Sequence, residues 1–398
     1  MAKYLPEFGW QPIILTTPIG ENPDSQFGPP NDFKENNRVI ETYGYSSPYG
    51  KKRLASKRYG RIRPFLKSLY KYYREIVHYP DAEKGWTPFA VKAGDELLQN
   101  EGVDAIISCS SPVTCHIIAK ELKKRRNIPW IADFRDLWTQ NHNYTYSPLR
   151  KLFEKRLERK TLATADALVT VSQPWAEKLK ELHREKSVYT ITNGFDPDKM
   201  NTRHVDLTSK FTITYAGQIY TGGQDTSKFL AVLKDLISEG IIKAEDVDVR
   251  FYGPELELLA KQIEKYGLSD VVKQYGIISR QISFEKQMES QVLLLPKWED
   301  KKEHGAIAGK LFEYLAARRP ILATGGHSDA VTQILKETNA GIDAHTVEDI
   351  KNALRKLYTE YKLTGKTSYH GRTKEINKYS YREMARKFAA ILDDLQEA

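Results

Sequence analysis

The 398-residue chain carries 61 Lys and Arg against 52 Asp and Glu, a formal net charge of +9, and 40% of its residues are hydrophobic. This composition is typical of a globular protein of two or three domains, and 11% aromatic residues exclude a mainly disordered chain. Its two cysteines exclude a disulfide scaffold and favour a reducing compartment. No apolar run approaches the roughly 20 residues that span a bilayer.

Short apolar strands alternate with amphipathic helices along the chain. Strands are expected at Pro12–Thr16, Asp104–Cys109, Pro129–Asp133, Ala167–Val171, Val188–Ile191, Phe211–Ala216, Val247–Tyr252, Val271–Tyr275, Gln291–Leu295, Pro320–Ala323 and Ala340–Ile342. Helices are expected at Val113–Arg126, Leu149–Ala163, Pro174–Leu182, Ser227–Ser238, Pro254–Tyr266, Ile282–Gln287, Ala308–Ala317, Ala330–Thr338, Val347–Tyr361 and Tyr381–Leu395. Continuously apolar strands followed by helices predict an α/β fold with parallel sheets.

The alternation falls into two runs, separated by the turn-rich segment NGFDPDK after Ile191. We therefore predict an N-terminal domain at 1–204 and a C-terminal domain at 205–372, both Rossmann-like and facing a cleft. A last helix within 373–398 is expected to return to the N-terminal domain. Region 18–64 has no regular pattern and is expected to be a surface insertion.

Two loops are candidate phosphate sites. The first follows the strand ending at Ala216 and contains Gly217, Gln218, Gly222 and Gly223, whose backbone amides can approach a phosphate. It matches neither a Walker loop nor the dinucleotide fingerprint, and a tight strand–helix turn is the alternative.

The second candidate is the loop 304–309 and the helix after it. Amides around Gly305 and the Lys310 side chain can hold a diphosphate, and Glu313 lies one turn later on the same helix face. The alternative is an ordinary solvated Lys–Glu pair.

Two further places carry polar groups at strand ends. Asp133 and Asp136 follow an apolar strand, where they either serve catalysis or form a salt-bridged loop. Ser110 and Ser111 precede a helix that their hydroxyls are expected to cap. The pair Asp246 and Asp248 forms a D-x-D, but at the start of a strand, so we predict no metal site there.

A basic stretch at 51–74 contains Lys67, Lys71 and Arg74 between aromatic residues. Such a mixture is typical of a helix lying on an anionic membrane. A solvated basic face is the alternative, and no nucleic-acid-binding module is visible. We expect a cytoplasmic protein that binds peripherally to the inner face of the membrane.

Five segments together carry a family resemblance. In chain order they are WIADFRDLW, ADALVTVSQPWAEKL, ITNGFDPD, ITYAGQIYTGG and KLFEYLAARRPILAT. Their order and spacing resemble those of GT-B glycosyltransferases, the retaining, family-4-like enzymes that build bacterial cell-surface glycans. The resemblance covers nearly the whole chain.

The resemblance implies transfer of a hexosyl unit from a UDP- or GDP-sugar to a polysaccharide or lipid-linked acceptor, with retention and without a metal or other cofactor. It implies that Glu313 binds the ribose, that the two glycine-containing loops, Lys310 and Leu311 surround the diphosphate, and that residues 276–280 lie beside the base. Asp133 or Asp136 is expected near the sugar and the acceptor hydroxyl, and Ser111 near the acceptor.

The chain departs from the family pattern in three places. Gly305 stands where many relatives have a second Glu, so that His304 is expected to contact the sugar instead. The first loop lacks the usual cations, which leaves the diphosphate to Lys310 with help from Lys297 or Arg280. The sequence begins inside a helix, so the first strand and its Gly-rich loop are expected to be absent. Two alternatives to a transferase stay open, a nucleotide-sugar epimerase and a non-catalytic nucleotide-sugar-binding relative.

Overall fold

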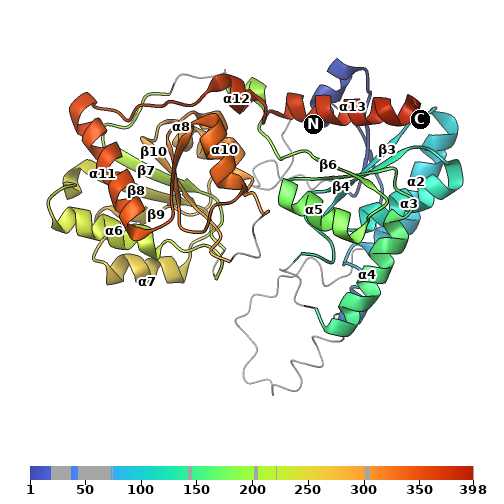
Figure 1. Cartoon of the computed structure of the whole chain (residues 1–398), viewed down its shortest axis with the longest axis horizontal. Coiled ribbons are helices and arrows are strands. Elements are labelled where there is room, and N and C mark those ends of the chain that lie inside the picture. Colours follow the sequence, from blue (N-terminus) through green and yellow to red (C-terminus); the bar gives the residue numbers. More distant parts are fainter. Residues whose placement is uncertain are drawn as a thin grey trace. The chain divides into compact units, whose positions relative to one another are not determined.

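The computed structural model describes residues 1–18, 37–43, 73, 75–141, 146–200, 205–220, 222–300 and 305–397, with the backbone alone at 199 and 200. Contacts divide the chain into two compact units (Figure 1). Unit 1 ends at Thr192 and takes up the chain again at Ala385, whereas unit 2 is built from Asn193–Met384. The predicted ranges 1–204, 205–372 and 373–398 stay predictions.

Unit 1 contains two separate parallel sheets among its described residues. Its elements are η1 (Ala2–Phe8), β1 (Ile13–Thr16), β2 (Arg38–Glu41), η2 (Lys84–Trp86), α2 (Thr87–Asn100), β3 (Ile106–Ser110), α3 (Thr114–Arg126), β4 (Trp130–Phe134), α4 (Pro148–Leu162), β5 (Ala167–Thr170), α5 (Gln173–Leu182) and β6 (Ser187–Thr190). One sheet has the order β1-β2 and the other β3-β4-β5-β6. The C-terminal part of α13 (Tyr381–Glu397) also belongs to this unit, where Trp10 donates a hydrogen bond to Asp393.

Unit 2 contains one parallel sheet of six strands. Its elements are η3 (Pro197–Met200), β7 (Phe211–Ala216), α6 (Ser227–Ser238), η4 (Ala244–Asp246), β8 (Val247–Tyr252), α7 (Glu257–Lys265), β9 (Val272–Gln274), α8 (Arg280–Met288), β10 (Val292–Pro296), α9 (Lys310–Ala317), β11 (Ile321–Thr324), α10 (Ala330–Thr338), β12 (Gly341–Ala344), α11 (Val347–Thr364) and α12 (Thr373–Asn377). The strand order is β12-β11-β10-β7-β8-β9. Helices cover both faces, as a doubly wound sheet requires.

The apolar run of β10 shows why this sheet is buried on both faces. Val292 and Leu294 belong to the core cluster that also contains residues of α6, α7 and α11. Leu293 and Leu295 belong to the opposite cluster, which contains residues of α9, α10 and α12. Alternate side chains point to opposite faces of a strand, so a run without polar residues fits only a strand covered on both sides.

The core of unit 1 encloses a neutral histidine on α3. His116 is fully buried, and its ring lies 4.4 Å from that of Phe134. Trp130 donates to the Ser108 hydroxyl and Ser108 lies 2.7 Å from His116 Nδ1. His116 Nε2 has no partner among the described residues, and burial lowers the pKa of the imidazole to about 3.

Most predicted elements are present within one to three residues of their expected bounds, and β7, β8, α6 and α10 match them fully. Among the α-helices and strands, three were not predicted, namely α2, α12 and the strand β2, which lies inside the expected surface insertion 18–64. None of the helices in the described ranges is long and apolar enough to cross a bilayer.

Candidate functional site

The sheet of unit 2 has one switch point, between β7 and β10. The chain proceeds outward from β7 to β8 and β9, and then returns to place β10 on the other side of β7. In open α/β sheets ligands bind at the carboxyl edge beside such a reversal. The loops that follow β7, β8 and β10 are therefore where a ligand site is expected.

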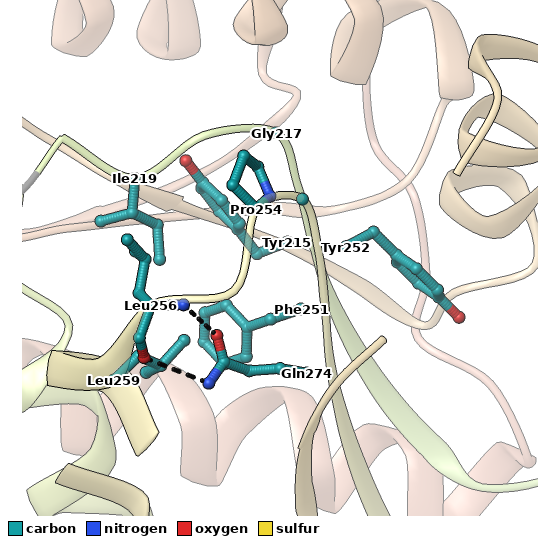
Figure 2. Close-up of a pocket in the computed structure, with 10 residues that line it drawn as sticks. Tyr215, Gly217, Ile219, Phe251, Tyr252, Pro254, Leu256, Leu259 and Gln274 are labelled. Carbon is teal, nitrogen blue, oxygen red and sulfur yellow. Dashed lines mark hydrogen bonds between the residues drawn. The ribbon is translucent and has the colours of Figure 1, made fainter. Parts of the chain in front are cut away.

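Two glycines allow the loops after β7 and β8 to meet closely. Gly217 has φ +127° and donates from its N–H to the Tyr252 carbonyl at 2.7 Å. A Cβ on Gly253 would lie 2.1 Å from the Gly217 oxygen, so only glycine fits there. Below this contact lies a small pocket lined mainly by apolar side chains, including Tyr215, Phe251 and Leu259 (Figure 2).

Lys310, the first residue of α9, points its ammonium group at this glycine turn. Its Nζ lies 3.8 Å from the centre of the Tyr215 ring, hydrogen-bonds to the Tyr215 hydroxyl, and lies 3.3 Å from the Gln218 carbonyl oxygen. Lost hydration lowers the pKa of Lys310 to about 7, and Glu313 offsets this only in part. A diphosphate at this place would supply the counter-charge that the ammonium group lacks.

Glu313 and Arg280 form an ion pair of 3.2 Å between α9 and α8. Both side chains are exposed, so the pair is weak and its two members can exchange partners at little cost. In the chain, residues 276–279 connect β9 to Arg280 at the start of α8, and Tyr275 just before them stacks on Tyr252 with ring centres 5.1 Å apart.

The remainder of the first glycine loop is fixed to the segment after β10. A Cβ on Gly223 would lie 2.0 Å from the Trp298 ring, and Gly223 accepts a hydrogen bond from Glu299 N–H. Tyr220 stacks on Trp298 with ring centres 5.5 Å apart. Gly222 has φ +88° and open space around it.

Lys297 occupies a different environment from the one predicted. Its side chain is 1% exposed, and Nζ lies 2.8 Å from Asp343 Oδ1 and 3.5 Å from Asp329 Oδ1. It also donates to the His327 carbonyl at 2.7 Å and to the Thr332 hydroxyl at 3.2 Å. Its charge is thus already balanced, which argues against the expected diphosphate role.

The other residues predicted to bind the donor lie in different environments. Gly305 is buried, and Leu311 is fully buried in the core cluster beneath α9, where its side chain serves packing. His304 lies outside the described residues, so its predicted contact with the sugar stays a prediction.

In unit 1, Asp133 and Asp136 lie in different environments at the end of β4. Asp133 is buried, and Arg135 Nε lies within 2.9 Å of both its oxygens. Burial raises the pKa of Asp133, and Arg135 opposes this rise. Asp136 is exposed, no described residue hydrogen-bonds to its carboxylate, and lost hydration raises its pKa. Asp136 is the better placed of the two to meet a ligand.

The predicted cap of α3 is wrong. No side chain of Ser110 or Ser111 caps this helix; the Asp81 carboxylate accepts hydrogen bonds from Thr114 N at 2.8 Å and from its hydroxyl at 2.6 Å. Ser111 is exposed, and its predicted acceptor contact stays a prediction. Lys67, Lys71 and Arg74 lie outside the described residues.

The D-x-D carboxylates are both engaged in ion pairs. Asp246 accepts from Tyr358 at 2.7 Å and from Lys362 at 2.8 Å, and Asp248 pairs with Arg250 at 2.7 Å. Over the described ranges, three or more metal-ligating side chains do not gather anywhere.

Sequence reasoning missed three residues at the carboxyl edge. Tyr215 lies under the Lys310 ammonium, Gly253 permits the close turn, and Asp343 neutralises Lys297. The only signal for Gly253 was its place directly after a strand that ends in Tyr252. Tyr215 lies within the segment ITYAGQIYTGG quoted above, but no role was assigned to it, and nothing in the sequence marks Asp343.

Comparison with known proteins gives the fold and the family. Sucrose-phosphate synthase from Thermosynechococcus elongatus superposes with a TM-score of 0.63 at 13% identity, covering 99% of this chain and 91% of that one. A glycosyltransferase from Rickettsia africae gives 0.61 at 16% identity, covering 99% and 92%. HepE from Anabaena, solved with UDP and glucose, gives 0.59 at 12% identity, covering 96% and 99%. These likenesses show the GT-B fold.

No curated protein matches the sequence. Residues 1–199, half of the chain, match the model of Glycosyltransferase Family 4. Together with its fold, this match shows that the chain belongs to Glycosyltransferase Family 4 and is a transferase enzyme.

Proposed function

We propose that the enzyme transfers a hexosyl unit from a UDP- or GDP-sugar to a polysaccharide or lipid-linked glycan, with retention of configuration. The observation that carries the donor part is Lys310, whose ammonium group has hydroxyl and carbonyl partners but, among the described residues, no carboxylate ion pair. A nucleoside diphosphate is the ligand chemistry that would complete it. HepE, which shares the fold, was solved with UDP and glucose.

Each residue of the donor site then has a role that follows from its chemistry. Lys310 and the N–H groups at the start of α9 offset the charge of the diphosphate as the sugar leaves. Glu313 exchanges Arg280 for the two ribose hydroxyls, and Arg280 becomes available to the phosphates. The departing phosphate oxygen takes the proton of the acceptor hydroxyl, so no strong protein base is needed. Asp136 and His304 are proposed to contact the sugar or the acceptor.

We further propose that the enzyme works in the cytoplasm, bound to the inner face of the membrane, because a lipid-linked acceptor is found there. Its excess of nine positive charges favours an anionic surface.

The test is a calorimetric titration of the full chain with UDP, GDP and their glucose conjugates, followed by NMR of slow donor hydrolysis. We expect UDP or GDP binding that is weakened at least about tenfold in Lys310→Met and unchanged in Lys336→Met, which alters a surface lysine of α10. Release of the α-hexose from an α-linked donor supports retention. Absence of nucleotide binding at millimolar concentration rejects the donor site, and reversible sugar interconversion would instead indicate an epimerase.

A further inference from the structure

Helix α4 buries three of its charged residues, including both of its carboxylates. Arg150, Glu154 and Glu158 are all buried, although charged residues of a surface helix normally face water. This helix runs along the edge of unit 1 (Figure 1). The buried charges must therefore have partners inside unit 1. The residues that this orientation exposes on the outward face also need an explanation.

The partners on the inner side are specific. Arg150 donates to the carbonyls of Glu75, His78 and Pro80, and its guanidinium pairs with Glu154 at 2.8 Å. Glu158 accepts hydrogen bonds from the backbone N–H and the hydroxyl of Thr139. Because buried charges are stable only when paired, these contacts fix which face of α4 points outward.

The outward face of α4 combines apolar and cationic side chains. Leu149, Leu152 and Phe153, spaced as neighbours on one helix face, are 64%, 66% and 57% exposed. The remaining exposed side chains of the helix beyond Pro148 are Lys151, Lys155, Arg156, Arg159 and Lys160. Both carboxylates of α4 are on the buried side, so this face carries positive charge alone.

The apolar area extends beyond the helix. The segment that carries Ile76 is tied to the start of α4, since Glu75 accepts from the Ser147 hydroxyl at 2.7 Å and Tyr79 donates to the Phe153 carbonyl at 3.3 Å. Ile76 is 75% exposed. We call Ile76 and the outward residues of α4 the α4 face.

The geometry points to the α4 face as the surface by which this protein lies on a membrane that contains anionic lipids. Leucine and phenylalanine side chains enter the boundary between head groups and acyl chains, while the five flanking cations contact lipid phosphates. The phosphates of a nucleic acid would pair with the cations, but they would leave the three exposed apolar side chains of α4 in water. An acidic protein partner could contact both the cations and the apolar side chains. The experiment below distinguishes such a partner from a membrane.

Membrane contact through the α4 face rests on the proposed function in one respect only, which is that it would give the enzyme access to a lipid-linked acceptor. Binding of α4 to lipid and binding of UDP to unit 2 involve different residues and are measured separately. Failure of one therefore leaves the other standing.

The experiment is sedimentation of the full chain with vesicles of phosphatidylcholine, with and without phosphatidylglycerol. We expect binding to the anionic vesicles that weakens as salt is added. The triple variant Leu149→Ser, Leu152→Ser, Phe153→Ser and the triple variant Lys151→Glu, Lys155→Glu, Arg156→Glu should each bind at least about tenfold more weakly. A Phe153→Trp variant should show a blue shift of its fluorescence on anionic vesicles.

Matched controls come from unit 2. The pair Leu258→Ser, Leu363→Ser removes exposed leucines elsewhere, and the pair Lys234→Glu, Lys336→Glu removes exposed cations. Both should bind vesicles like the unmodified protein, and every variant should keep its UDP affinity and circular dichroism spectrum. Unchanged vesicle binding in the serine variant overturns the inference. So does binding to a soluble polyanion without binding to vesicles, or self-association that the serine variant abolishes.

Discussion

Lys297 and Lys310 lie at the same edge of the same sheet, but their environments are opposite. Lys297 is enclosed by the carboxylates of Asp329 and Asp343, so its charge is balanced before any ligand arrives. Lys310 lies on the ring of Tyr215, and Glu313, three residues further along α9, is paired with Arg280. A lysine near a predicted phosphate site therefore indicates phosphate binding only if no carboxylate of the protein already balances its charge.

The largest expected effect is on stability at Lys297. A Lys297→Met variant removes the ammonium group from Asp343 and Asp329, whose side chains are 10% and 15% exposed, which should cost about 3–5 kcal/mol of unfolding free energy. Urea unfolding measures it. Lys378→Met, which removes a more exposed lysine, should cost less than about 1 kcal/mol. Equal losses of unfolding free energy in Lys297→Met and Lys378→Met would show that Lys297 contributes no more to stability than a surface lysine.

The next effect is on ligand affinity at Lys310. Removing a charge-assisted contact costs about 1.5–3 kcal/mol, so Lys310→Met should bind UDP roughly tenfold to 150-fold more weakly. Its unfolding free energy should not fall, because the ammonium group that it removes is poorly hydrated in the free protein. Calorimetry and urea unfolding on the same preparation check both parts. Loss of stability without loss of affinity would make Lys310 a structural residue like Lys297.

The affinity for a UDP-sugar should also depend on pH. The pKa of Lys310 in the free protein is lowered to about 7, and a bound diphosphate favours its charged form. Affinity should therefore be highest below pH 7 and fall by up to about tenfold per pH unit above it. Calorimetry in buffers of different ionisation enthalpy should detect proton uptake on binding near pH 7. A flat profile, or the same profile in Lys310→Met, would contradict this.

The smallest effect is expected at Gly217. Its φ of +127° strains any other residue, and an added Cβ would lie 3.0 Å from Lys310 Nζ. Gly217→Ala should cost about 1 kcal/mol in stability and displace the ammonium group, weakening UDP binding several-fold. Gly240→Ala, at φ +71° with no atom within 4 Å, should cost similar stability and leave UDP affinity unchanged. A change of affinity in both variants would point to a general loss of folding.

The sheets were predictable because their strands are short, continuously apolar and separated by helices of ordinary period. The strand β2 and the helix α2 were not. The strand β2 has only four residues in polar surroundings, and α2 contains Pro88 and Gly94 within a weak apolar pattern. The glycine turn after β7 and the position of Lys310 and Glu313 in the first turn of α9 were predictable because both are local in the chain, whereas their roles in donor binding stay predictions.

Features that depend on residues far apart in the chain escaped prediction. Asp81 caps α3 in place of the adjacent serines, and Asp343 on β12 neutralises Lys297, which follows β10, with β11 between the two strands. The same holds for α4, whose sequence has one stripe of acids and another of leucines. Only its inner contacts, among them those of Arg150 with the segment 75–80, decide which stripe faces out.

The buried imidazole of His116 makes a pH-dependent contribution to the stability of unit 1. In the unfolded chain His116 takes up a proton below its ordinary pKa near 6.5, whereas in the folded protein it stays neutral down to about pH 3. Unit 1 therefore loses up to about 1.4 kcal/mol for each pH unit of acidification between these values. The neutral imidazole of His116 is thus one group in the core that makes acidification unfavourable for the folded state.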